Sequence, residues 1–478
     1  MKNHIVFSSL VILLLTGCSH GPDGTGIYKQ IQQEFFAGRL GNTFQLYDSL
    51  KNVFPEEEKL IHKADSLIQI AERIYLDFIV TEEEIIPLLE KNKLSFTEKD
   101  IKEWEDNKWL EYRIIDGEKR YFNRAVSNLK LIRGFNEDRA LRDSLEAGDE
   151  FSQFLKKHTL EVMRESAQRS KIGMPVKMII NYTLIVKPDI VPGGEVIRCW
   201  LPWPKESIPR QNNIEFISAS DSNYIISPDT MLHRTIYMEA IAVEGQPVVF
   251  KASFSYESSG QYHNPCDINI FPYDTISGLY KKYTSEELPH INFSDDVRSL
   301  ADSITVNDSI PLKVLQSLYY WIDNNIPWAG ALEYSTVPDI PGYVLRNRHG
   351  DCGMKTFLLL SLLRYKGIPA RWQSGWMMHP GEENLHDWCE VYFEGDGWIP
   401  VDMSFGLQYS SYKRLRDFYM TGIDSYRLIV NTGVGGELFP PKKYLRSETN
   451  DFQRGEVEWS GGNLYFDKWD YQMEIVYR

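Results

Sequence analysis

Cysteine, basic charge and long apolar runs are all scarce in this sequence, and each scarcity excludes a class of protein. Five cysteines among 478 residues are too few for a framework of disulfides. Lys and Arg total 52 against 67 Asp and Glu, which gives a net charge of −15. We therefore expect no nucleic-acid partner and no attraction to anionic lipid through bulk charge.

The composition of the chain is that of a globular protein. Apolar residues make up 42% of the sequence and charged residues 25%, which are ordinary values for a folded protein. A chain of 478 residues has room for about three domains of usual size. Helical and strand periods alternate along it, which predicts an α+β multidomain fold. The oligomeric state is not predicted by these patterns.

The first 18 residues predict export. Lys2 precedes an apolar run over 5–15 that is too short to cross a bilayer as a helix, and the run ends in Leu15-Thr16-Gly17-Cys18. This ending resembles the lipobox of bacterial lipoproteins. The resemblance implies a lipoprotein signal peptide over 1–17 and a lipid on Cys18, which would anchor the protein in the bacterial cell envelope on a periplasmic or outer-membrane face. The alternative is an ordinary secretory peptide with a chance cysteine.

Two regions of different character follow the signal peptide. Residues 18–26 are small, polar and rich in glycine, which predicts a flexible tether. Helical periodicity then prevails over 27–170, which predicts a mainly helical domain. Within it, Thr97 with Asp100 has the spacing of a capping box, and Asp116-Gly117 predicts a hairpin turn. We find no candidate nucleophile there and expect a scaffold or a partner surface.

Strand periodicity begins at about residue 171. Alternating apolar residues predict a β-sandwich-like module over 171–258. Within it, the segment 200–204 is interpreted as a buried strand end, with a surface for ligand stacking as the alternative. Residues 259–408 hold the motifs described next and are the predicted catalytic core. Short strand patterns over 409–478 predict a β-rich extension.

A buried helix is predicted immediately after Cys352. Nearly every residue over 357–363 is apolar, and Gly367 and Pro369 end the helix. Cys352 therefore lies at the helix N-terminus, where the macrodipole and the free N–H groups favour negative charge and lower the pKa of a thiol. The same N–H groups can stabilise an oxyanion. Cys352 is the candidate nucleophile.

His386 and Asp402 are placed to complete the site. A thiolate in acyl transfer needs a proton acceptor, and that acceptor needs an orienting group. His386 begins a strand pattern that turns at 394–397, and Asp402 ends the returning strand. A loop with an odd number of residues puts Asp402 opposite Trp388 and on the face of His386. A two-residue loop would put it on the other face, unless a bulge corrects the register.

Other histidines and cysteines are weaker candidates. His379 lies in a loop before Pro-Gly and is expected at the surface, and His349 lies outside the predicted helix. Cys389 alternates away from the strand face that carries the histidine, so we expect a buried, inert thiol. No metal-ligand spacing is present, and we expect neither a metal nor a cofactor. The sequence leaves open a disulfide among Cys199, Cys266 and Cys389.

The motifs together resemble the transglutaminase-like superfamily, with a papain/transglutaminase-like core over roughly 295–408. The segments that carry the resemblance are Gly350-Asp351-Cys352, the apolar helix, Gly367-Ile368-Pro369-Ala370-Arg371, His386-Asp387-Trp388 and Pro400-Val401-Asp402. The resemblance implies that Cys352 is the nucleophile, His386 the general base and acid, and Asp402 the orienting carboxylate. It also offers Trp328 as an oxyanion-stabilising indole.

The reaction depends on what releases a thioester from Cys352. Water makes the protein a peptidase or amidase, and an amine makes it a cross-linking transglutaminase. An exported, anchored protein meets peptides, proteins and other amides of the cell envelope, which favours hydrolysis, with amine transfer as the alternative. A second alternative is a non-catalytic lipoprotein that binds peptides or glycans. In that case a binding groove would be lined by four tryptophans, Trp372, Trp376, Trp388 and Trp398. We expect these side chains to lie in the core instead.

Overall fold

The computed structural model describes residues 23–137, 149–168 and 171–478. They divide into two compact units. Unit 1 comprises the described part of Met1–Glu72 together with Ile114–Glu118, and unit 2 comprises Arg73–Arg113 and Lys119–Arg478. The predicted signal peptide and Cys18 lie outside the described residues. No helix within the described ranges is long and apolar enough to span a membrane.

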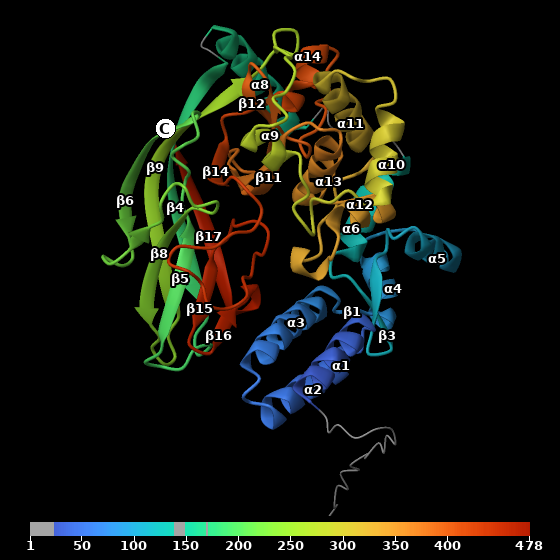
Figure 1. The fold of residues 1–478 in the computed structure, drawn as a ribbon, viewed down its shortest axis with the longest axis vertical. Helices are drawn as coiled ribbons and strands as arrows, with labels where there is room; N and C mark the ends of the chain where they lie inside the picture. Colours follow the sequence, from blue (N-terminus) through green and yellow to red (C-terminus); the bar gives the residue numbers. More distant parts are fainter. Residues whose placement is uncertain (1–22, 138–148, 169–170) are drawn as a thin grey trace, which may run out of the picture. The chain divides into compact units, whose positions relative to one another are not determined.

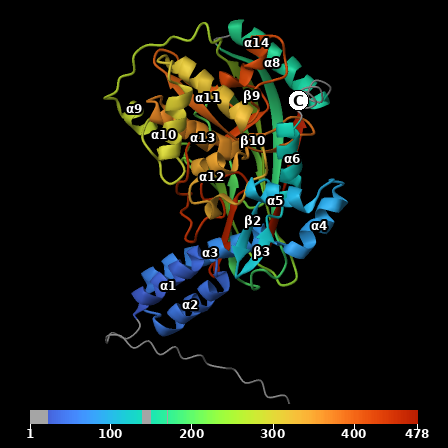
Figure 2. The ribbon, with the colours of Figure 1, turned by 90° about the vertical axis from the view of Figure 1, so that its right-hand side faces the viewer.

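Unit 1 is built from helices. These are α1 (Gly24–Phe36), α2 (Leu40–Val53) and the first part of α3 (Glu58–Asp77). Figures 1 and 2 show α1 and α2 side by side, and their apolar side chains meet around Ile31, Leu50 and Ala64. Helix α1 begins within the predicted tether because the Asp23 side chain caps it, accepting the backbone N–H of Gly26 at 2.6 Å.

The chain from Arg73 to Gln168 continues the helical region, with one small sheet of order β1-β3-β2. Thr97 caps α5 through the predicted capping box with Asp100. The Asp116-Gly117 turn joins β2 to β3 with both φ angles positive, and it is part of unit 1. The elements are β1 (Val80–Thr81), α4 (Glu82–Lys91), α5 (Glu98–Asp106), β2 (Tyr112–Ile115), β3 (Glu118–Tyr121), α6 (Ala125–Glu137) and α8 (Glu150–Gln168).

Two five-stranded sheets with antiparallel pairing contain the strands of the predicted module over 171–258, and four strands from beyond residue 408 complete them. One has the order β13-β9-β4-β17, with β6 also on β9, and the other has the order β16-β15-β5-β8-β7. Trp200 and Trp203 are buried, as expected for a strand end. The strands are β4 (Ile172–Val186), β5 (Val196–Pro202), β6 (Gln211–Ala219), β7 (Ile225–Ile226), β8 (Thr235–Ile241), β9 (Val248–Tyr262), β13 (Gly422–Ile423), β15 (Glu456–Trp459), β16 (Gly462–Leu464) and β17 (Trp469–Tyr477).

Segments far apart in the sequence meet in these sheets. Strand β17 pairs with β4 from Trp469 opposite Val186 to Tyr477 opposite Met178. Strand β15 likewise pairs with β5. The short 3-10 turn η3 (Phe466–Lys468) leads into β17. The region 409–478 therefore supplies strands to the sheets that begin at residue 172.

A four-stranded antiparallel sheet and several helices contain the region of the predicted catalytic core, and the last of these elements lie after residue 408, beyond its predicted end. Helix α13 packs against β10 and β11 (Figures 1 and 2). The sheet order is β12-β11-β10-β14, with bounds β10 (Ala370–Met377), β11 (Asn384–Phe393), β12 (Gly397–Val401) and β14 (Arg427–Asn431). The helices are α9 (Gly278–Tyr283), α10 (Asp295–Ile304), α11 (Pro311–Asn325), η1 (Tyr334–Thr336), α12 (Ile340–Asn347), α13 (Cys352–Tyr365), α14 (Lys413–Arg416) and η2 (Phe418–Met420).

The predicted α+β class is confirmed, and the predicted apolar helix is α13. Every residue from Gly353 to Arg364 is buried, so this helix is enclosed by protein on all sides. Three of the tryptophans considered for a binding groove, Trp372, Trp376 and Trp388, are buried in the core, as expected.

Candidate active site

Cys352 is the first residue of α13, as the sequence predicts. Asp351 precedes it as the N-cap, and its Oδ1 accepts the backbone N–H of Met354 at 2.9 Å and the hydroxyl of Tyr334 at 2.7 Å. This cap fixes where the helix begins. The backbone N–H of Cys352, at the first helical position, stays outside the helical hydrogen-bond ladder and is directed towards the helix end.

The thiol of Cys352 differs from the sequence expectation. Burial, followed by the nearby carboxyls of Asp387 and Asp351, raises the pKa of Cys352 well above its ordinary value. The thiol donates a hydrogen bond to Asp387 Oδ2 at 3.5 Å. The expectation of a lowered pKa is therefore wrong for this arrangement, because burial of the thiol and then two acidic side chains oppose the effect of the helix N-terminus.

His386 and Asp402 meet through the register of one hairpin. Strands β11 and β12 pair with Phe393 opposite Gly397 and Cys389 opposite Val401, so the loop between them has three residues. The expected odd loop is confirmed, and it brings Asp402 to the face of His386. His386 Nε2 lies 2.8 Å from Asp402 Oδ2. Because Nε2 faces Asp402, the other ring nitrogen, Nδ1, is the one available to groups in the cavity that His386 lines.

Asp402 is completely buried among donors. Its Oδ2 also lies 3.1 Å from the Arg427 guanidinium, and its Oδ1 accepts the backbone N–H groups of Ser404 at 3.0 Å and Phe405 at 3.1 Å. Burial opposes ionisation, yet His386 and Arg427 hold the pKa of Asp402 below its usual range. Burial also lowers the pKa of His386, although Asp402 opposes that change.

A buried network extends behind Asp402. Arg427 pairs with Asp424 Oδ2 at 2.8 Å, and His379 Nε2 lies 3.0 Å from Asp424 Oδ1. Although burial opposes it, the charges of Arg427 and His379 hold the pKa of Asp424 well below its usual range. The expectation of a surface His379 was wrong, since its side chain is fully buried. A backbone hydrogen bond from the N–H of Met378 to Tyr426 O holds the residue before His379 in the interior.

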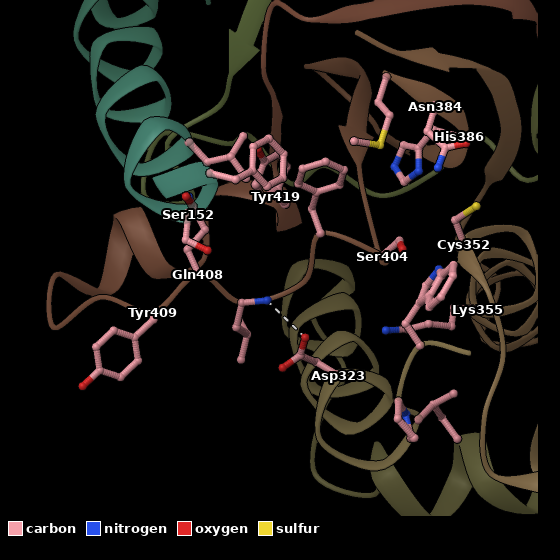
Figure 3. A pocket seen from close by; sticks show the side chains of 18 of the residues that line it. Ser152, Asp323, Cys352, Lys355, Asn384, His386, Ser404, Gln408, Tyr409 and Tyr419 are labelled. Carbon is pink, nitrogen blue, oxygen red and sulfur yellow. Dashed lines mark hydrogen bonds between the residues drawn. The ribbon is translucent and has the colours of Figure 1, made fainter. Parts of the chain in front are cut away.

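Two cavities meet at Cys352. The first, of about 450 Å³, is lined by Cys352 and His386 together with aromatic and apolar side chains such as Phe405 (Figure 3). The second, of about 600 Å³, is lined by Cys352 and Asp387. Figure 3 shows Cys352 and His386 on the same pocket, one from α13 and one from β11. Four residues line both cavities: Trp328, Cys352, Asn384 and Leu385.

Trp328 is held beside the nucleophile by backbone pairing. The N–H of Gly350 donates to Pro327 O and the N–H of Ala329 donates to Gly350 O, each at 3.2 Å. The indole is 44% exposed and lines both cavities. Trp328 therefore shares both cavities with Cys352, and its oxyanion-stabilising role stays a prediction.

The remaining candidates lie apart from the site. His349 is buried with Nε2 3.2 Å from Lys108 O. Cys389 is fully buried, as expected, and contacts Val401 O through its thiol. Within the described ranges no three His, Cys, Asp or Glu side chains are grouped to hold a metal ion. Four cysteines of these ranges are free thiols: Cys199, Cys266, Cys352 and Cys389.

Sequence reasoning missed Asp387 and Arg427. Asp387 follows His386 directly in a strand, and neighbours in a strand point to opposite sides. That alternation was the available signal that Asp387 would approach Cys352 from the side opposite His386. Arg427 gave no local signal, because the pairing of β14 with β10 brings it in from beyond the predicted core.

Comparisons with known proteins agree with this geometry. The model of the transglutaminase-like superfamily matches residues 298–403. A relative from Bacillus subtilis, the uncharacterized protein YebA, is 23% identical over 176 residues, which cover 31% of this chain. This chain spans about a quarter of that relative's length, 24%.

Solved structures with low sequence identity are also similar. One is described as a "putative cysteine protease" from Cytophaga hutchinsonii, with 13% identity and a TM-score of 0.43, covering 64% of this chain and 92% of that one. Another is the periplasmic domain of TgpA from Pseudomonas aeruginosa, with 15% identity and a TM-score of 0.25, covering 50% of this chain and 90% of that one. The family match and the geometry together identify residues 298–403 as a transglutaminase-like core.

Proposed function

We propose that this protein is a cysteine acyl-transfer enzyme that hydrolyses peptide or amide bonds through a thioester on Cys352. One observation carries the proposal. The imidazole of His386, oriented by Asp402 at 2.8 Å, and the Cys352 sulfur at a helix N-terminus line the same cavity. A nucleophile, a base and an orienting carboxylate in this order suit acyl transfer.

The chemistry has two steps. In the first, His386 Nδ1 takes the thiol proton while Sγ bonds to the carbonyl carbon, and the carbon–nitrogen bond breaks as the amine takes that proton. In the second, water gives a proton to His386 and its oxygen bonds to the thioester carbon. The carbon–sulfur bond then breaks, and the sulfur regains the proton.

The protonated resting thiol is consistent with this order of events. The Cys352 thiol donates to Asp387 Oδ2 with 3.5 Å between sulfur and oxygen, and the pKa of Cys352 is raised by burial and by the same carboxyl. Burial lowers the pKa of His386, which favours the imidazole form that can accept a proton. The backbone N–H of Cys352 and the indole of Trp328 are the proposed donors to the oxyanion.

Turnover of a fluorogenic peptide library tests the proposal. Cys352→Ala should reduce turnover to background, because it removes the proposed nucleophile. Cys266→Ala also removes one free thiol but should leave turnover unchanged, because Cys266 is exposed and has no part in the proposed reaction. In oxygen-18 water, hydrolysis should put the heavy isotope in the new carboxyl group. If an added primary amine is incorporated instead, the enzyme is an amine transferase. Full activity of Cys352→Ala would overturn the proposal.

We propose in addition that Cys18 carries a lipid and holds the protein in the cell envelope, where peptides, proteins and other amides are the substrate class. The sequence Leu15-Thr16-Gly17-Cys18 supports this. The mass of the mature N-terminal peptide should show acyl chains on Cys18. Cys18→Ser should release the protein from membranes, and retention of this variant would contradict the anchor.

A further inference from the structure

The second cavity at Cys352 is strongly acidic. Among the described residues, seven carboxyl side chains and only two arginines line it. The carboxyls are those of Asp77, Glu333, Asp351, Asp387, Glu448, Asp451 and Asp467. The first cavity, on the other side of the same sulfur, has no such excess, since Lys156 and Lys355 line it with Asp323.

Most of these carboxyls already have structural partners. Glu448 lies 3.7 Å from Arg454, and Glu333 accepts the Tyr465 hydroxyl at 3.0 Å. Asp351 caps α13. These groups are held by the fold and need no ligand.

Two carboxyls are different. Asp451 is only 9% exposed, yet within the described ranges no other side chain pairs with its carboxyl or donates a hydrogen bond to it, and it lines the cavity. Asp387 is 2% exposed and meets only neutral donors, the thiol of Cys352 and the amide of Gln453 at 2.8 Å. Neither carboxyl has a cation of the described residues within salt-bridge distance, although Asp451 is acted on by the charge of Arg454 and by its own backbone N–H. Burying a carboxyl without a close counter-charge is costly, so these two groups favour a cationic ligand.

The electrostatics of the cavity agree. Burial and the neighbouring acidic groups raise the pKa of both Asp387 and Asp451 well above the usual range. A cation in the cavity would relieve this repulsion. The exposed indole of Trp328 at the boundary of the cavity offers a cation with a π face.

We propose that this cavity is a subsite for a primary ammonium group of the substrate, located next to the amide bond that Cys352 attacks. The inference rests on the proposed function only in taking Cys352 as the reacting atom. The substrate class is thereby narrowed to peptides or amides with a free amino group close to the scissile bond. The source is a terminal α-ammonium or the side chain of a lysine-type residue.

Ammonium binding would also assist the chemistry. Asp387 and Asp351 are among the causes that raise the pKa of Cys352. A positive charge placed beside Asp387 counters their effect on the sulfur. The thiol therefore ionises more readily when the matching substrate is present.

Charged thiol reagents test the cavity without requiring turnover. The cationic 2-aminoethyl and the anionic 2-sulfonatoethyl methanethiosulfonates each form a disulfide with a cysteine and release methanesulfinate. Labelling is followed by peptide mass, with the exposed Cys266 as internal reference. Relative to Cys266, Cys352 should prefer the cationic reagent by about tenfold at low salt. Equal preference at the two cysteines would overturn the proposal.

A matched pair of variants assigns the preference to the cavity. Asp451→Asn should reduce the preference of Cys352 for the cationic reagent severalfold. Asp470→Asn makes the same charge change at a side chain that is 70% exposed and outside the cavity, so it should leave the preference unchanged. An unchanged preference in Asp451→Asn would also overturn the proposal. Thermal melts of both variants confirm that they fold.

Protection of Cys352 from neutral iodoacetamide separates the sources of the ammonium group. Alanylalanine amide presents an α-ammonium, N-acetyl-lysine amide presents a side-chain ammonium, and N-acetyl-alanylalanine amide presents neither. Slower alkylation with the first or the second identifies the source, and protection by neither, or equally by the uncharged peptide, contradicts the subsite. Protection without turnover of any peptide would leave the subsite standing and count against the hydrolase.

Discussion

Every group that faces the carboxyl of Asp402 is a donor. His386 and Arg427 approach Oδ2, and two backbone N–H groups donate to Oδ1. An asparagine at this position must turn its NH₂ group towards one of these donor pairs, which leaves buried donors unsatisfied. The carboxylate therefore specifies both the orientation and the tautomer of the imidazole.

We accordingly expect Asp402→Asn to lower kcat by about 10²- to 10⁴-fold, because His386 would be held in the wrong tautomer. Steady-state kinetics with the best library peptide measure the change, and circular dichroism checks that the fold is retained. Activity within twofold of the wild type would show that Asp402 serves packing alone.

Asp351 combines two roles that one substitution can separate. Its Oδ1 caps α13, and its charge is one cause of the raised pKa of Cys352. Asparagine caps helices as well as aspartate does but carries no charge. Asp351→Asn should therefore speed the alkylation of Cys352 at pH 7 with little loss of stability.

Asp351→Ala is the matched control, because it removes the charge and the cap together. It should cost about 0.5–2 kcal/mol of unfolding free energy. Iodoacetamide kinetics and urea titrations give the two readouts. Slower alkylation in Asp351→Asn would mean that the carboxyl assists ionisation of the thiol.

The start of α13 depends on a residue without a side chain. A Cβ on Gly353 would lie 2.1 Å from the Tyr334 hydroxyl and 2.7 Å from Asp387 Oδ2. Gly353→Ala must therefore displace one of these groups, and we expect a loss of about 1–3 kcal/mol. Urea unfolding measures it. The alkylation rate of Cys352 should change as well, since Asp387 contacts the sulfur, and an unaltered rate together with unaltered stability would contradict this packing.

Local patterns predict the elements of the site well, and distant pairing explains what they miss. The start of α13 and the odd loop between β11 and β12 follow from neighbouring residues, so the positions of Cys352 and of the His386–Asp402 pair could be predicted. The pKa of Cys352 and the burial of His379 depend on residues brought in by tertiary contacts, Asp387 and Asp424. The alternation of β11 indicates the side on which Asp387 lies, but no sequence period places Asp424 beside His379 or shows that Asp387 contacts the sulfur.

For the whole molecule, buried ionisable groups predict a pH-dependent stability. Burial raises the pKa of Asp77 to about 6 and that of Glu111 to about 7. At these two sites the folded state binds protons that the unfolded state releases, so their contributions to the unfolding free energy should rise as the pH falls from about 7.5 to about 5.

Buried histidines act in the opposite direction. Burial lowers the pKa of His263, His290 and His349 to about 4, so these side chains lower the unfolding free energy as the pH falls below about 6.5. Further acidification adds to this loss, because Asp402 and Asp424 have lowered pKa values and must then be protonated.

Urea titrations at several pH values check this dependence. Asp77→Asn should reduce the gain in unfolding free energy between pH 7 and pH 5 by about 1 kcal/mol, since it removes one raised carboxyl, while the exposed Asp470→Asn should not. A pH profile of stability that Asp77→Asn leaves unchanged would refute the assignment.

The pairing of β17 with β4 also sets the order in which the chain can mature. The edge of β4 stays open until the ribosome has delivered residues 469–477, and an open edge is a hazard during synthesis. Arg427, which neutralises Asp402, is likewise translated after both Cys352 and His386. A nascent chain that already contains Cys352 and His386 thus still lacks the positive charge beside Asp402, and the site is complete only after residue 427 has been added.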